Sequence, residues 1–178
     1  LYYKKAVHED PLLAKGWLYL TNIYFDQKNY EKAAYYISKA LSIDESDALY
    51  WRRYSEIKLK LNFFEEAIKG FEMCLSLGDE DINVFIALVD VLTFVGEFNA
   101  ALSILIKAQK GHKNFAEIEY RFAGLFWLLN KQKFGIEHLI KAMNIDYDYH
   151  IILKELFSSV YFNEGTQKLL SDFKKATE

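Results

Sequence analysis

Proline and glycine are scarce in this chain, which has one Pro and eight Gly among its 178 residues. Turn-rich β architectures and disordered segments usually need more of these residues, so the composition disfavours both. The single cysteine, Cys74, excludes an internal disulfide framework, and no Cys/His cluster has the spacing of metal ligands. No run of 18 apolar residues is present, so the sequence predicts no membrane-spanning helix.

An excess of charge of one sign is also missing. Lys and Arg number 22 against 25 Asp and Glu, which gives a net charge of −3, and the two signs are interleaved. Nucleic-acid-binding proteins usually cluster basic residues on one face. The pattern therefore predicts no nucleic-acid partner.

Catalytic motifs are absent as well. No P-loop, GxSxG, HExxH or GxGxxG occurs, and the histidines are scattered with no nucleophile at a recurring distance: His8, His112, His138 and His150. Glu117 and Glu119 are paired carboxylates, which we interpret as part of a solvated helix face. Cys74 falls in a column of small residues, where a buried and unreactive thiol is expected. We expect no enzymatic activity, no cofactor and no metal.

What the sequence does contain is a 34-residue period. The first half of each unit has a recurring stripe: Trp17, Leu20, Thr21 and Tyr24, then Trp51, Tyr54, Ser55 and Lys58, then Phe85, Leu88, Val89 and Leu92. The second half has another: Ala33, Ile37 and Ala40, then Ala67, Phe71 and Cys74, then Ala101, Leu105 and Ala108. A fixed period of this length is typical of a solenoid, in which each unit buries its apolar face against its neighbours.

Each unit is predicted to form two amphipathic helices, because the stripes recur at i, i+3, i+4 and i+7. Asn29 is a candidate N-cap for a second helix. The acidic segments 44–47 and 79–81 are suited to turns and caps. Thr21, Ser55 and Ala123 are expected to face Ala33, Ala67 and Gly135, because short side chains let two helices approach closely.

This two-helix unit resembles the tetratricopeptide repeat, whose pattern is W-x2-L-G-x2-Y, then A-x3-F, then P. The resemblance implies an all-α fold, a right-handed α-solenoid of stacked helix-turn-helix units. It divides one continuous solenoid domain into the second helix of a truncated repeat (1–13), three repeats (14–47, 48–81 and 82–115), a divergent repeat (116–149) and a degenerate repeat that forms a C-terminal cap (150–178). Because Glu119 and Gly135 replace Trp17 and Ala33 in the divergent repeat, we expect it to be the least stable. Gly135→Ala should stabilise it if a methyl group fits.

The first residues already fit the repeat, since Tyr3, Ala6 and Pro11 continue its columns upstream. We interpret the chain as a fragment of a longer protein. The exposed edge of the half-repeat, with Tyr2, Tyr3 and Val7, is expected to favour self-association through residues 1–13. A cytoplasmic location is the expectation, although a targeting signal upstream of Leu1 would lie outside this sequence.

The resemblance also implies that first helices line a concave groove, which would bind a peptide or a helix of a partner protein. Aromatic and arginine side chains are favoured anchors in such contacts. The candidate groove residues are Tyr19, Asn22, Arg52, Arg53, Glu56, Asp90, Tyr120, Arg121 and Trp127. For Trp127, packing between adjacent first helices stays open as an alternative.

Three other functions are alternatives to this scaffold hypothesis. The segment could be the regulatory or substrate-docking arm of a multidomain enzyme or signalling protein. An RNA-binding repeat is disfavoured because Glu56, Asp90 and Glu117 lie where basic residues would be needed. Chaperone-binding members of the family clamp a terminal carboxylate, but only Asn22 fits that pattern. Leu18, Arg53, Asn83 and Ala87 occupy the positions that require Lys, Asn, Lys and Arg.

Overall fold

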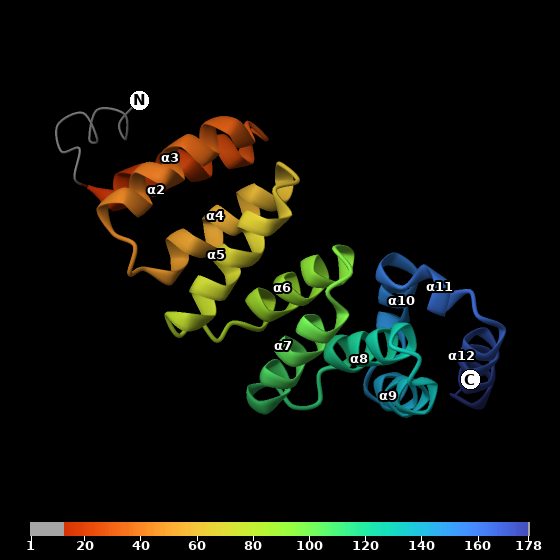
Figure 1. Ribbon diagram of the computed structural model, residues 1–178. Helices are drawn as coiled ribbons and strands as arrows, with labels where there is room; N and C mark the ends of the chain where they lie inside the picture. The colour runs from red at the N-terminus through yellow and green to blue at the C-terminus, as the bar shows by residue number, and fades with distance from the viewer. Residues whose placement is uncertain (1–12, 178) are drawn as a thin grey trace. The chain divides into compact units, whose positions relative to one another are not determined.

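The computed structural model describes residues 13–177, which form a series of helices joined by short turns (Figure 1). The helices are α2 (Ala14–Asp26), α3 (Tyr30–Ile43), α4 (Ala48–Lys60), α5 (Phe64–Ser76), α6 (Ile82–Phe94), α7 (Phe98–Gly111), α8 (Ala116–Leu128) and α9 (Gln132–Ile145). They are followed by the 3-10 helix η1 (Asp148–His150), α10 (Ile151–Leu156), α11 (Ser158–Tyr161) and α12 (Glu164–Thr177). Within this range no residue is in a strand, so the predicted all-α class is confirmed.

The sequence period is also a structural period. The first helices α2, α4, α6 and α8 begin at residues 14, 48, 82 and 116, and the second helices α3, α5, α7 and α9 begin at residues 30, 64, 98 and 132. Both series advance by 34 residues. Each predicted repeat between residues 14 and 149 therefore contains one helical hairpin.

The chain divides into two compact units, one ending at Val84 and the other beginning at Phe85. The half-repeat predicted for residues 1–13 and its self-associating edge at Tyr2, Tyr3 and Val7 fall almost entirely outside the described residues.

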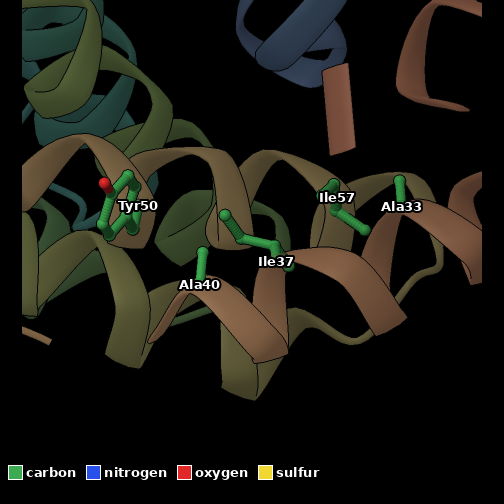
Figure 2. Close-up of a cluster of buried hydrophobic side chains, with 5 residues drawn as sticks. All are labelled: Ala33, Ile37, Ala40, Tyr50 and Ile57. Atoms are coloured by element: carbon green, nitrogen blue, oxygen red, sulfur yellow. The ribbon is translucent and has the colours of Figure 1, made fainter. Parts of the chain in front are cut away.

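In the first unit, α3 and α4 pack across a small apolar core (Figure 2). Ala33, Ile37 and Ala40 of α3 and Tyr50 and Ile57 of α4 are all at most 2% exposed. Burial of an aliphatic side chain of isoleucine size contributes about 1.5–3 kcal/mol. The two alanines contribute little burial of their own, but they allow the neighbouring helix to come close.

Close helix contact is what the small-residue columns provide. A Cβ atom added at Gly70 of α5 would stand 2.1 Å from the Ser55 Oγ of α4. At Gly135 of α9 it would stand 3.1 Å from the backbone carbonyl oxygen of Ala123 in α8. A methyl group at Gly135 would therefore be in tight contact with the backbone of α8, and Gly135→Ala stabilises the repeat only if the two helices can move apart by a few tenths of an ångström.

The turn inside each hairpin has a positive φ at one recurring position. Lys28, Asn62 and Asn130 have φ values of 57°, 61° and 58°, and Gly96 has 86°. In the first hairpin the Asn29 N–H donates to the Tyr24 carbonyl and the Lys28 N–H to the Phe25 carbonyl, both at 2.9 Å. This pair of bonds is the Schellman motif, and the other three hairpins repeat it. The predicted N-cap is confirmed too, since the Asn29 side chain accepts a hydrogen bond from the Lys32 N–H.

Lys28 is the one residue of these four that is neither Gly nor Asn, the residues that tolerate this conformation best. We predict that Lys28→Gly raises the free energy of unfolding by about 0.5–1 kcal/mol, because the left-handed backbone costs a residue with a Cβ about 1–2 kcal/mol and glycine gives part of this back as entropy. Urea unfolding measures the change. The matched control is Lys69→Gly, also at an exposed lysine but inside α5, where roughly 1 kcal/mol should be lost. An equal loss of unfolding free energy in both variants would contradict the left-handed backbone conformation at Lys28.

Candidate protein-interaction surface

One side of every first helix carries the residues that the repeat pattern assigns to the groove. We call this side the first-helix face. Its members recur at i, i+4, i+7 and i+11 of each helix, and they are Lys15, Tyr19, Asn22 and Asp26 of α2, Leu49, Arg53, Glu56 and Lys60 of α4, Asn83, Ala87, Asp90 and Phe94 of α6, and Glu117, Arg121, Gly124 and Leu128 of α8.

On α2 and α4 this face exposes large side chains. Tyr19 is 51% exposed and Leu49 is 50% exposed. Arg53 is less exposed, since 27% of its side chain is accessible to solvent. Its Nη1 is 2.7 Å from Glu56 Oε2, and its guanidinium carbon lies 4.7 Å from the centre of the Phe25 ring. The ring and the carboxylate hold the guanidinium in one position.

Asn22 shows an unusual feature of the same face. Its Oδ1 atom is shielded from solvent and accepts no hydrogen bond within the described part of the chain. A buried acceptor without a partner costs about 1–3 kcal/mol.

Arg52, another predicted groove residue, is engaged within the fold. Its Nη1 lies 2.7 Å from Asp81 Oδ2 and its Nε 3.6 Å from Glu56 Oε1. Asp81 also accepts a hydrogen bond from the Asn83 N–H at 2.9 Å, as predicted for a helix cap. The Asn83 hydrogen bond and the Arg52 guanidinium hold the pKa of Asp81 below its usual value. Arg52 therefore fastens α4 to the turn before α6.

On α8 the predicted groove residues are covered. Arg121 is 5% exposed, and it binds Asp90 of α6 through two parallel contacts, Nε to Oδ1 at 2.7 Å and Nη2 to Oδ2 at 2.8 Å. Such a bidentate pair is strong and fixes geometry. Tyr120 has no exposed surface, and its hydroxyl donates to the carbonyls of Asp146 and Tyr147. Burial raises the pKa of Tyr120. The expectation that Tyr120 and Arg121 are exposed anchors is wrong.

The cover on α8 comes from the C-terminal segment. Phe157 lies in a column where earlier repeats have small residues, and a ring cannot fit between paired helices at that position. The helix is interrupted there: α10 ends at Leu156 and α11 begins at Ser158. The ring is instead buried against Gly124, where an added Cβ would stand 2.4 Å from it.

Trp127, the last candidate, is half-buried. Its Cε3 atom would lie 3.3 Å from a Cβ at Gly135 of α9. The indole therefore contacts α9 of its own hairpin on one side, and its place in a groove stays a prediction.

Sequence reasoning missed a buried polar cluster around Glu119, which is 1% exposed and not solvated as expected. Its carboxylate accepts hydrogen bonds from Gln109 Nε2 of α7 at 3.0 Å and from Lys141 Nζ of α9, and it contacts His138 Nδ1 of α9 at 2.6 Å. Burial is the largest influence on Glu119 and raises its pKa, but the bonds from His138 and Lys141 outweigh it, so the pKa is lowered. The signal was a Glu in an aromatic column with His138 and Lys141 one helical turn apart.

Cys74 has the inert setting that the sequence indicated. Its side chain has no exposed surface, and the thiol donates to the Ala48 carbonyl at 3.3 Å. Burial raises the pKa of Cys74 to about 12. Since the thiolate is the reactive form, this cysteine serves packing.

Among residues 13–177, no helix is both long and apolar enough to cross a membrane, and no group of three or more His, Cys, Asp or Glu side chains could hold a metal ion. Comparison of the sequence with protein-family models and with curated proteins gave no match.

Solved structures do share the fold. The structure of MamA is 17% identical over 83% of this chain and 86% of that chain, with a TM-score of 0.76. PilF of Pseudomonas aeruginosa is 17% identical over 96% of this chain and 71% of that chain, with a TM-score of 0.65. A chain of the Cut9–Hcn1 hetero-tetramer of the APC/C is 15% identical over 80% of this chain and 28% of that chain, with a TM-score of 0.64.

These three are tetratricopeptide-repeat proteins. Together with the helical hairpins spaced by 34 residues, they show that the present chain has the tetratricopeptide-repeat fold.

The contact between Gly124 and Phe157 gives a prediction. Gly124→Ala should cost about 1–3 kcal/mol, because the methyl group overpacks the site, and Phe157→Ala should cost about 3–5 kcal/mol through the cavity it leaves. The double variant should lose clearly less than the sum, since the missing ring makes room for the methyl group. Urea unfolding provides the numbers. Gly111→Ala is the control, because a Cβ there meets no atom within 4 Å. Strict additivity would show that the ring does not occupy this space.

Glu119 gives a second prediction, on pH. Its folded-state pKa lies below the ordinary value of 4.5, so its contribution to stability is complete above that pH and is lost as the pH falls further. At pH 7 Glu119→Gln should lower the free energy of unfolding by about 1–3 kcal/mol. The gap between variant and wild type should narrow below pH 4.5. A gap that stays constant down to pH 3 would mean that ionisation of Glu119 contributes nothing.

Proposed function

We propose that this chain is a non-catalytic protein-interaction scaffold, which binds a peptide or a helix of a partner protein on the first-helix face. The binding is concentrated on α2 and α4. The observation that supports this most directly is the exposure of Tyr19 and Leu49, about half of each side chain, on the face that the repeat assigns to partners. On α8 the same face is occupied by the chain's own C-terminal segment.

The chemistry of α2 and α4 suits protein recognition. Tyr and Arg side chains are enriched among the residues that dominate binding energy. Arg53 is already held by Glu56 and by the Phe25 ring. A partner that contacts it therefore loses little additional side-chain entropy.

The charges on this face indicate what the partner should offer. Arg53 lies beside Glu56, and Asp26 and Lys60 end the face on α2 and α4. A segment with apolar side chains and charges of alternating sign would be complementary. Its association should slow as salt screens the field.

The fold supports a scaffold over other classes. One structural neighbour, Cut9, was solved in a hetero-tetramer with Hcn1. Helical hairpins that contact only their neighbours can leave one side of a first helix available to a second protein, and α2 and α4 expose Tyr19 and Leu49 on that side.

The test uses the full-length protein as bait with cell extract, and compares Tyr19→Ala and Arg53→Ala with wild type. Tyr35→Ala is the matched control, because Tyr35 is 58% exposed but lies on the second helix α3. A partner retained by wild type and by the control should bind Tyr19→Ala or Arg53→Ala at least tenfold more weakly, about 1.4 kcal/mol. The helical melting curve should not change.

The reverse pattern would overturn the proposal. If binding survives Tyr19→Ala and Arg53→Ala and is lost with Tyr35→Ala, the second helices carry the interaction.

A further inference from the structure

The second unit contains a basic pocket lined by its second helices α7 and α9 and by the turn before α8, and none of its lining residues is used by the proposed function. Its volume is about 340 Å³, and it is shallow and open to solvent. The lining residues are Gln109 and Lys110 at the end of α7, Lys113 and Asn114 in the turn before α8, and Lys141 of α9. Three ammonium groups and two carboxamides surround it, and no acidic residue is in its lining.

The positive charge of this pocket is only partly compensated. Lys141 is paired with the Glu119 carboxylate behind the wall. Lys110 and Lys113 are exposed, and neither forms an ion pair within residues 13–177. The C-terminal end of α7 favours one cation through its dipole. It does not account for the second uncompensated cation, Lys113, which lies in the turn before α8.

The wall is fixed from behind by Glu119. The same buried carboxylate accepts from Gln109 Nε2 at 3.0 Å and from Lys141 Nζ, so it ties together two lining residues that belong to α7 and α9. His138, a third partner of Glu119, is clamped by stacking on Phe122 and Phe126, with ring centres 4.7 Å and 5.2 Å away. Two of the five lining side chains are therefore held in place before any ligand arrives.

We propose that this pocket binds a phosphate group. Lys110 and Lys113 provide two uncompensated charges, which match the charge of about −1.5 to −2 on a phosphate monoester at pH 7 and exceed that of a single carboxylate. Lysine ammonium groups bind phosphate as point charges, and the Asn114 carboxamide adds a neutral donor. The phosphate belongs either to a phosphorylated side chain of a partner or to a free phosphate ion.

The experiment titrates the full chain with three probes: inorganic phosphate, a capped Gly-phosphoserine-Gly peptide and the capped Gly-Ser-Gly peptide. The NMR signals of the Gln109 and Asn114 side-chain amides report binding at the pocket. Phosphate-bearing probes should give saturable shifts, and the unphosphorylated peptide should give none. Saturation with the phosphopeptide at tenfold lower concentration assigns the source to a partner, and equal affinity assigns it to free phosphate.

Variants separate the pocket from general surface charge. Lys110→Glu with Lys113→Glu should weaken phosphate binding at least tenfold while the helical circular dichroism spectrum is retained, because both side chains are exposed. A small fall in melting temperature is expected, since Lys110 lies in the last turn of α7. The matched control is Lys107→Glu with Lys133→Glu, two exposed lysines on α7 and α9 outside the pocket, which should retain binding. No saturable shift, or equal loss in both pairs, overturns the proposal. Tyr19→Ala should leave phosphate binding intact whether or not the first-helix face binds a protein.

Discussion

The close approach of two helices within each hairpin is the constraint on which the rest of the structure depends. At Gly70 the helices come so near that the Ser55 hydroxyl occupies the place of a methyl group, and at Gly135 the Ala123 carbonyl oxygen leaves a methyl group little room. Alanines at Ala33 and Ala67 satisfy the same constraint with no exposed surface. Large side chains are thereby directed to the flanks of each hairpin, where Trp17 and Tyr24 stack on Tyr36 at 5.9 Å and 5.2 Å.

The C-terminal segment shows what happens when that constraint is broken. Phe157 is larger than the residues at this position in the other repeats. The helix is interrupted at Phe157, between α10 and α11, and its ring packs against Gly124. This single change covers part of the first-helix face of α8. The exposed side chains of Tyr19 and Leu49 belong to hairpins whose columns are intact, whereas Gly124 of α8 is covered by Phe157.

The sequence predicted the regular part of this fold well, because period and caps are local signals. The helix starts at Ala14, Ala48, Ile82 and Ala116, the N-cap at Asn29 and the buried thiol of Cys74 all follow from spacing. It did not predict the contacts between distant residues. Asp90 and Arg121 are 31 positions apart, and a period says which side of a helix a residue occupies but not which segment lies against that side. For the same reason Glu119 was mistaken for a surface carboxylate. Its place in an aromatic column was visible, while the three donors around it come from α7 and α9.

The turns within the hairpins affect how susceptible this chain is to proteolysis. Each connects its helices with three residues, 27–29, 61–63, 95–97 and 129–131, and each is closed by two backbone hydrogen bonds. Proteases prefer exposed loop tips that can be nicked without disturbing buried backbone. A three-residue turn closed by two hydrogen bonds is too short to enter a protease active site as an extended segment. Cleavage therefore requires the hairpin to unfold locally. The rate of cleavage in each of the four turns would then measure the local unfolding of that hairpin. Comparing the four rates would give the local stability of each hairpin along the chain.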